Sequence, residues 1–213
     1  MIDDILIFDD IVSKADQDFL LNFVINNPNK FDLLENTVGN TIEKNLKPYP
    51  GKVYATKNGL KIETDNFDLY EIIHSIETNV CKKLELQFLQ NSRQRINWLE
   101  PLGREYNKAE LIHWDTIEQH YVIIYYVYDS DGDTCIYTNE NGNDASQYVK
   151  SFTESGLDPD SFKLLKSITP KKGRVVFFNG KYPHCATYPN NGDRFVININ
   201  LIAKEYKKNK SFI

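Results

Sequence analysis

The spacing of apolar residues changes character about two fifths of the way along the chain. Between residues 9 and 27, apolar side chains recur at helical spacing after Ser13-Lys-Ala-Asp16, a start signal close to a capping box with Asp in place of Glu. A second helical stripe runs from about residue 67 to residue 84. Between the two lies Asn-, Gly- and Pro-rich sequence with a strand-like piece at residues 52–56. The first 90 residues are therefore expected to form a helical support with entrance segments.

From about Asn91 onward the apolar period is two, as in half-buried β-strands. Turn signals separate eight such segments: Arg93–Leu99, Glu110–Asp115, Tyr121–Tyr128, Asp133–Thr138, Lys163–Thr169, Arg174–Asn179, His184–Tyr188 and Arg194–Ile202. The polar stretch 139–161 interrupts this rhythm and is expected to be a long loop or lid.

Many short strands favour a sandwich or barrel, and a jelly roll is an economical way to close one. We therefore predict one mostly β domain over residues 1–213, with N-terminal helices. Residues 1–90 would provide two or more supporting helices, and residues 91–213 the jelly-roll core.

Length, charge and cysteine content narrow the class of protein. The 213 residues carry 25 Lys and Arg against 30 Asp and Glu, a net charge of -5, so no nucleic-acid partner is expected and a neutral or basic substrate is favoured. The longest apolar run, Tyr121–Tyr128, is far shorter than the ~20 residues of a membrane helix, and no secretory signal opens the chain. We expect no membrane partner. Three cysteines without metal-binding spacing or an even disulfide framework favour a cytoplasmic location.

Two residue types that bind metals stand together at the end of one expected strand. In His113-Trp114-Asp115, alternation puts the imidazole and the carboxylate on one face and Trp114 on the other. A third ligand must come from elsewhere, and His184 opens another expected strand 69 residues after Asp115. Two histidines and one carboxylate form the facial triad of non-haem Fe(II) oxygenases, which leaves positions open for co-substrate and oxygen. By itself a His-x-Asp tripeptide is weak evidence for a metal site.

A basic residue follows the third expected metal ligand shortly along the chain. Arg194 lies ten positions after His184, and alternation directs Arg194, Val196, Asn198 and Asn200 to one face of the last expected strand. An arginine directed into an apolar barrel needs a partner, and its planar guanidinium suits a carboxylate bound through two hydrogen bonds. The alternative is a surface arginine on an edge strand.

Together, His113-x-Asp115, His184 and Arg194 resemble the signature of Fe(II)- and 2-oxoglutarate-dependent dioxygenases, particularly the prolyl 4-hydroxylase-like branch, over about residues 91–202. The resemblance implies a double-stranded β-helix in which His113, Asp115 and His184 hold a catalytic Fe(II). It implies that Arg194 pairs with the far carboxylate of the co-substrate 2-oxoglutarate. It also implies O2-dependent hydroxylation of a C–H bond in a peptide, prolyl or otherwise, or in a small molecule. Succinate and CO2 would be released, with ascorbate as a reductant.

Further stretches extend the resemblance to the co-substrate site. Residues 124–128, Ile-Tyr-Tyr-Val-Tyr, are similar to a Tyr-Tyr-Leu-Asn strand of the animal oxygen-sensing prolyl hydroxylases, which implies that Tyr126 binds the distal carboxylate. Residues 131–134 look like the family's Gly-Gly-Glu-Thr turn, which implies that Thr134 faces the co-substrate. Arg194-Phe-Val-Ile-Asn198 parallels an Arg-Tyr-Ala-Ile-Thr stretch, so Asn198 stands where the family has Thr, and the resemblance makes it a candidate to bind the co-substrate.

The chain also departs from the family pattern. The family often has a Tyr about ten residues before the first metal ligand, where it helps to hold the metal-side carboxylate; Gly103 stands there in this chain, and Tyr106 or Asn97 would have to substitute. Two other classes stay open. A cupin-like metal enzyme without 2-oxoglutarate, such as an isomerase, would use the same triad and bind a substrate carboxylate with Arg194. A non-catalytic β-sandwich binding module would carry the triad by coincidence.

Overall fold

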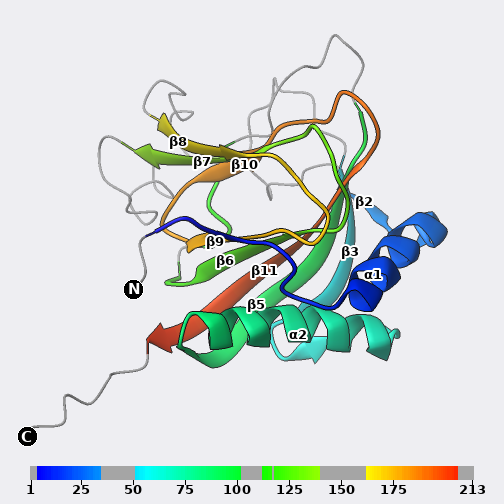
Figure 1. Ribbon diagram of the computed structural model, residues 1–213, viewed down its shortest axis with the longest axis horizontal. Coiled ribbons are helices and arrows are strands. Elements are labelled where there is room, and N and C mark those ends of the chain that lie inside the picture. The colour runs from blue at the N-terminus through cyan, green and yellow to red at the C-terminus, as the bar shows by residue number, and fades with distance from the viewer. Residues whose placement is uncertain (1–3, 35–50, 102–111, 117, 140–161, 206–213) are drawn as a thin grey trace, which may run out of the picture.

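The computed structural model describes residues 4–34, 51–101, 112–116, 118–139 and 162–205, drawn as ribbon in Figure 1. Within these residues the chain forms two α-helices, one short 3-10 helix (Pro28–Lys30) and two antiparallel sheets. The helices are α1 (Lys14–Asn26) and α2 (Phe67–Lys83). The strands are β1 (Leu6–Phe8), β2 (Asp32–Leu34), β3 (Gly51–Asn58), β4 (Lys61–Ile62), β5 (Leu86–Leu99), β6 (Tyr121–Tyr126), β7 (Thr134–Asn139), β8 (Phe162–Ile168), β9 (Val175–Asn179), β10 (His184–Ala186) and β11 (Arg194–Glu205).

The two sheets differ in size and face each other. The major sheet has eight strands in the order β1-β9-β6-β11-β5-β3-β2, with β4 paired to β3, and the minor sheet has the order β10-β7-β8. Figure 1 shows the minor sheet lying across from the major one. Apolar side chains fill the space between them: Val122, Ile124, Tyr126, Ile136, Ile168, Val176, Phe178 and Val196.

Both helices cover the outer face of the major sheet (Figure 1). The Oγ atom of Ser13 accepts a hydrogen bond from the backbone N–H of Asp16 at 3.1 Å, so α1 begins with the predicted cap. Asn66 caps α2 in the same way by accepting from the N–H of Leu69 at 2.9 Å. The apolar stripes of the helices pack on the alternate residues of the central strands, and the largest buried members of this core include Leu20, Ile73, Ile76, Tyr121, Ile123, Tyr125 and Phe177.

The predicted fold class is confirmed: the chain is mostly β, its N-terminal half supplies two helices, and the facing antiparallel sheets form a jelly roll. No helix among the described residues is long and apolar enough to cross a membrane.

Some expected boundaries were wrong. The first 90 residues are not only a helical support, because β1 pairs with β9, β3 pairs with β5, and β5 itself begins at Leu86. The expected strand 110–115 lies partly outside the described residues, and His113 forms an isolated bridge to His184 instead of closing a strand. Most of the expected loop 139–161 also lies outside the described residues.

Candidate metal centre

Three side chains expected to bind metal lie together between the two sheets. One ligand atom from each of His113, Asp115 and His184 lies within 4.8 Å of the others. Nε2 of His184 is 3.6 Å from Oδ2 of Asp115, and Nε2 of His113 is 3.9 Å from Oδ1 of the same carboxylate. The backbones of the two histidines exchange hydrogen bonds of 3.0 and 2.9 Å, so the main chain itself sets their spacing. The structure therefore brings residues 71 positions apart into one potential ligand set.

The charge state of these side chains suits a cation. Burial alone raises the pKa of Asp115, but its attraction to Arg93, then to the two histidines, is stronger and holds the pKa far below the ordinary value. An amino group of Arg93 donates a hydrogen bond to Oδ1 of Asp115, and Nδ2 of Asn198 donates to Oδ2 at 3.4 Å. Burial lowers the pKa of His184 to about 4, against the opposing attraction of Asp115. Asp115 is therefore ionised and His184 neutral near pH 7, the forms in which both bind metals.

An orphaned polar atom supports a metal at this place. Nε2 of His184 is buried and has no hydrogen-bond partner among the described residues, a costly arrangement unless a ligand completes it. Two imidazole nitrogens and one carboxylate oxygen are a donor set that divalent iron accepts. The residues present therefore fit the ion that the sequence resemblance implies.

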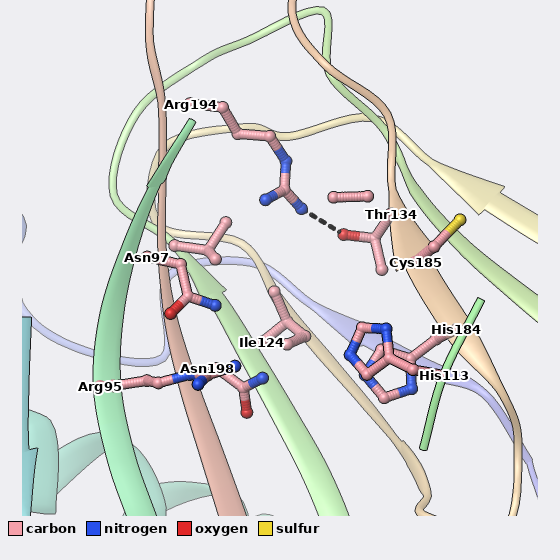
Figure 2. A pocket seen from close by; sticks show the side chains of 11 residues that line it. Arg95, Asn97, His113, Ile124, Thr134, His184, Cys185, Arg194 and Asn198 are labelled. Carbon is pink, nitrogen blue, oxygen red and sulfur yellow. Dashed lines mark hydrogen bonds between the residues drawn. The ribbon is translucent and has the colours of Figure 1, made fainter. Parts of the chain in front are cut away.

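A second polar group lies at the other end of the cavity that the histidines line (Figure 2). Arg194 is only 3% exposed; it donates from Nε to the carbonyl of Gly132 and from an amino group to Oγ1 of Thr134, both at 2.8 Å. The hydroxyl of Tyr126 donates to the same Oγ1 at 2.7 Å. Arg194 lies on β11, an interior strand between β5 and β6, so the alternative of a surface arginine on an edge strand is wrong.

Gly132 makes room for this arginine. A Cβ atom at position 132 would lie 2.7 Å from the carbonyl oxygen of Thr187 and 2.9 Å from Cδ of Arg194. Burial raises the pKa of Tyr126, more than the nearby Arg194 lowers it, so its phenol stays protonated and able to donate. The cluster thus presents a fixed guanidinium and a phenol hydroxyl, which together suit a carboxylate.

Both groups open into one cavity. Its lining combines the histidines and Arg194 with apolar walls and two asparagines, and comprises Arg95, Asn97, His113, Ile124, Thr134, His184, Cys185, Ala186, Arg194, Val196 and Asn198. Asn97, one of the two expected substitutes for the missing family Tyr, lies in this cavity, and the other, Tyr106, lies outside the described residues. Trp114 is directed elsewhere, as alternation predicts, and donates from Nε1 to the carbonyl of Lys181 at 2.8 Å.

Sequence reasoning missed Arg93 and Arg95 at this site. Both lie on β5, Arg93 at the carboxylate of Asp115 and Arg95 in the cavity wall. Their alternation with the apolar Ile96 and Trp98 was the available signal, because it places the arginines on the opposite face of the strand from those two side chains.

Comparisons with known proteins support the fold. No family model and no curated protein matches the chain. Among solved structures, a prolyl hydroxylase from Trichoplax adhaerens, in complex with a hypoxia inducible factor peptide, is 12% identical with a TM-score of 0.60, and the match covers 93% of this chain and 83% of that one. A prolyl-4-hydroxylase from Pseudomonas putida is 11% identical with a TM-score of 0.56, and the match covers 94% and 92% of the two chains. The chain has the fold of the prolyl hydroxylases.

The same fold is shared by an enzyme of another reaction type. The α-ketoglutarate-dependent, non-haem epimerase SnoN from nogalamycin biosynthesis is 9% identical with a TM-score of 0.62, and the match covers 95% of this chain and 77% of that one. A prolyl hydroxylase-like fold therefore does not by itself decide the reaction, which must be argued from the site.

Proposed function

We propose that the protein is an Fe(II)- and 2-oxoglutarate-dependent dioxygenase that hydroxylates a C–H bond of its substrate and releases succinate and CO2. The observation that carries this proposal is a single cavity that has potential metal ligands at one end and a buried arginine at the other. His113 and His184, with Asp115 beside them, form one end, and Arg194 with Thr134 forms the other. A five-carbon dicarboxylic 2-oxo acid needs both a metal for its oxo-acid end and a cation for its far carboxylate.

Each residue has a distinct role in this proposal. His113, Asp115 and His184 would hold the iron, which when bound supplies the activation of O2 and the oxidative decarboxylation of the co-substrate. Arg194 would bind the far carboxylate through two hydrogen bonds, and the hydroxyl of Tyr126 would turn from Thr134 to the carboxylate to donate a third. The side chains of Ile124 and Val196 form the apolar wall between the two ends and exclude water from it.

The similar solved structures contain bound molecules of two classes, a peptide and a small molecule. The Trichoplax enzyme was solved with a peptide fragment, and SnoN was solved with a nogalamycin compound, Fe3+ and α-ketoglutarate. We propose a peptide or small-molecule substrate for this chain, with O2 as co-reactant and ascorbate as an assay reductant. A cytoplasmic location is proposed on the cysteines alone.

Succinate release tests the reaction. Purified protein with Fe(II), ascorbate and 2-oxoglutarate is expected to release succinate, and Asp115→Ala is expected to abolish the release because one metal ligand is lost. Asp65→Ala, which removes an exposed carboxylate that pairs with Lys30 and does not line the cavity, serves as the control with unchanged release. The proposal is wrong if the wild type neither releases succinate with any substrate tested nor binds 2-oxoglutarate in a metal-dependent way.

A binding experiment separates the dioxygenase from a cupin-like metal enzyme. N-oxalylglycine, an unreactive analogue of 2-oxoglutarate, is expected to raise the melting temperature of the Mn(II)-loaded protein, and Arg194→Ala is expected to remove that rise while Mn(II) itself still stabilises the variant. Stabilisation by Mn(II) without any response to N-oxalylglycine would instead favour a metal enzyme that does not use 2-oxoglutarate. No response to either would favour a binding module.

A further inference from the structure

Two of the three cysteines lie directly opposite each other on neighbouring strands. Cys185 is the middle residue of β10, and the register of the minor sheet pairs it with Cys135 of β7. The adjacent pair, His184 with Ile136, faces the space between the sheets, so alternation places both thiols on the other face of the minor sheet. Figure 2 shows the sulfur of Cys185 pointing away from the cavity. The two thiols therefore share one face, next to a metal ligand but outside the metal site.

The two thiols are close enough to interact. A hydrogen bond from Cys185 lowers the pKa of Cys135, more than burial raises it. Sγ of Cys135 is also 3.6 Å from Oγ of Ser167, and Sγ of Cys185 donates to the hydroxyl of Tyr137 at 3.8 Å. Cys135 is only 7% exposed and Cys185 only 1%. Each thiol is therefore in contact with the other and shielded from bulky reagents.

The backbone around this pair shows what a bond between the two sulfurs would require. The N–H of Tyr137 donates to the carbonyl of Pro183 at 2.8 Å. The N–H of Thr187 donates to the carbonyl of Asp133 at 2.9 Å. The cysteine pair lies midway between these two hydrogen-bonded pairs and is of the same kind, because every second pair of an antiparallel ladder is hydrogen-bonded. The Cα atoms of such a pair lie about 5.5 Å apart, which is within the range of natural disulfides.

The Cβ atoms of a hydrogen-bonded pair are less well placed than its Cα atoms. They also lie about 5.5 Å apart, whereas a disulfide holds its Cβ atoms at about 3.8 Å. A bond between the sulfurs must therefore draw β10 towards β7 or twist it. Strained disulfides are readily reduced, and in a reducing compartment such bonds are transient and serve redox sensing.

His184 would carry this movement of β10 into the metal centre. The strand is only three residues long, so Cys185 cannot shift without its neighbour. The backbone of His184 is hydrogen-bonded to that of His113, and the centroids of the two rings are 4.7 Å apart. A displacement of β10 would therefore change the spacing of the metal ligands.

We propose that Cys135 and Cys185 form a reversible disulfide when the protein meets hydrogen peroxide, and that this disulfide weakens metal binding by displacing His184. The inference rests on the metal site of the proposed function, but not on its co-substrate or its reaction. It assigns a modification site to two residues that the proposed reaction does not use.

The chemistry balances with hydrogen peroxide as the only oxidant. The thiolate of Cys135 attacks one peroxide oxygen, the O–O bond breaks, and the departing hydroxide takes up the thiol proton to give water and a sulfenic acid. The sulfur of Cys185 then attacks the sulfur of Cys135, the S–O bond breaks, and hydroxide leaves with the proton of Cys185 as a second water. The two sulfurs lose two electrons in all, and the two peroxide oxygens gain them.

A count of thiols tests the first half of the proposal. Metal-free protein is treated with hydrogen peroxide, the excess is destroyed with catalase, and the protein is unfolded in N-ethylmaleimide. The number of alkylated cysteines is expected to fall from three to one, and dithiothreitol is expected to restore it. Peptide mass spectrometry is expected to link Cys135 to Cys185 and to find Cys81 alkylated. Cys81 lies apart on α2, where burial, helped by Glu77, raises its pKa to about 11.

Metal binding tests the second half. The oxidised and reduced forms are desalted and titrated with Mn(II), and the free ion is measured by its EPR signal. The oxidised form is expected to bind Mn(II) about 10-fold more weakly, the size of effect that follows when the support of a metal ligand is disturbed. Cys135→Ser is expected to bind Mn(II) equally before and after peroxide, and Cys185→Ala replaces it if it does not fold. Cys81→Ser is the matched control and is expected to behave like the wild type.

The contrary outcomes are distinct. Three alkylated cysteines after peroxide, or a link that includes Cys81, would overturn the inference and leave the proposed function standing. A disulfide between Cys135 and Cys185 with unchanged Mn(II) affinity would overturn the effect on the metal site. A loss of affinity that also occurs in Cys135→Ser would do the same, because the oxidation responsible would lie elsewhere. If the reduced protein binds no Mn(II), the metal centre is wrong and this inference fails with it.

Discussion

Burial keeps the imidazole of His184 neutral, which prepares it to bind a metal and also makes the stability of the metal-free fold sensitive to acid. A neutral imidazole is ready to ligate a metal, and burial keeps it neutral by lowering its pKa to about 4 from the ordinary 6.5. The unfolded chain therefore binds a proton at this residue at a higher pH than the folded chain does. Between these two values, acid must favour unfolding.

The metal-free protein is accordingly expected to lose stability as the pH falls from about 6.5 to about 4, by at most about 3 kcal/mol from this residue. Urea denaturation of the chelator-treated protein across that range measures the loss. Asp115 contributes little change there, because its lowered pKa leaves it ionised in the folded state and its unfolded value lies near the lower limit. In His184→Asn the slope within this window is expected to be smaller, and an unchanged slope would contradict the assignment.

The neighbouring tyrosines of β6 offer a matched test of the co-substrate site. Tyr126 faces Thr134 and Arg194, whereas Tyr125 packs in the core on the helix side with its hydroxyl unpartnered among the described residues. Tyr126→Phe is expected to weaken metal-dependent 2-oxoglutarate binding about 3- to 10-fold through loss of one hydrogen bond. Tyr125→Phe is expected to leave this affinity unchanged. Calorimetric titration of both variants provides the measurement, and equal effects would contradict the proposed role.

Single residues were predictable where local alternation and the family resemblance agreed. Arg194, Tyr126 and Thr134 were expected to act together, and the structure places them in one cluster. Arg93 and Arg95 were not identified, because alternation shows which residues share a face but not which face the helices cover. That choice is made by the packing of α2 on β5.

At the scale of elements, the contact between α1 and the loop before β9 depends on a glycine. Gly173 has a φ of +81°, and a Cβ there would lie 2.7 Å from Oε1 of Gln17, a buried α1 side chain that donates to Asp10 and to the carbonyl of Val12. Both the left-handed backbone and the close side chain require glycine at this position.

Gly173→Ala is expected to destabilise the fold by about 2–4 kcal/mol, since the strained backbone and the displaced Gln17 both add to the cost. Gly192→Ala is the control: its φ of +71° is similar but nothing lies within 4 Å of the added Cβ, so a cost of about 1–2 kcal/mol is expected. Denaturant midpoints of the two variants give the comparison. Equal losses would show that the contact with Gln17 contributes nothing.

The elements were predicted best where their periodicity was long. Both helices and the strands of the second half lie close to their expected positions, because each keeps an apolar stripe or alternation over several residues. The three-residue β1 was not expected, because it is too short for a pattern and its partner among the described residues, β9, is distant in the sequence. The start of β5 was placed seven residues late, since residues 86–92 do not alternate cleanly.

For the whole molecule, the candidate metal centre joins the two sheets. His184 lies on β10 of the minor sheet, and Asp115 contacts Arg93 and Asn198 of the major sheet. Its bridging position could not be read from the sequence, because the sequence gives no distance between residues 115 and 184. His184 was chosen as the third ligand because it opens another expected strand and because the family resemblance agrees with that choice.

A bound metal is therefore expected to stabilise the whole fold. At 100 times its dissociation constant, Mn(II) should add about 2.7 kcal/mol to the free energy of unfolding and raise the melting temperature by roughly 5–10 °C for a chain of this size. Differential scanning calorimetry with and without a chelator measures the shift. His184→Asn should lose most of it, and an undiminished shift in that variant would place the metal elsewhere.

The bridge between His113 and His184 has a consequence for the time course of folding. It joins residues 71 positions apart through two hydrogen bonds, and closing so long a loop costs chain entropy that other native contacts must offset. We expect the ligand set to be completed only after the rate-limiting barrier of folding has been crossed. A metal that recognises only this finished arrangement will slow the unfolding rate and leave the refolding rate unchanged. The ion would stabilise the native state after it has formed and would not accelerate its formation.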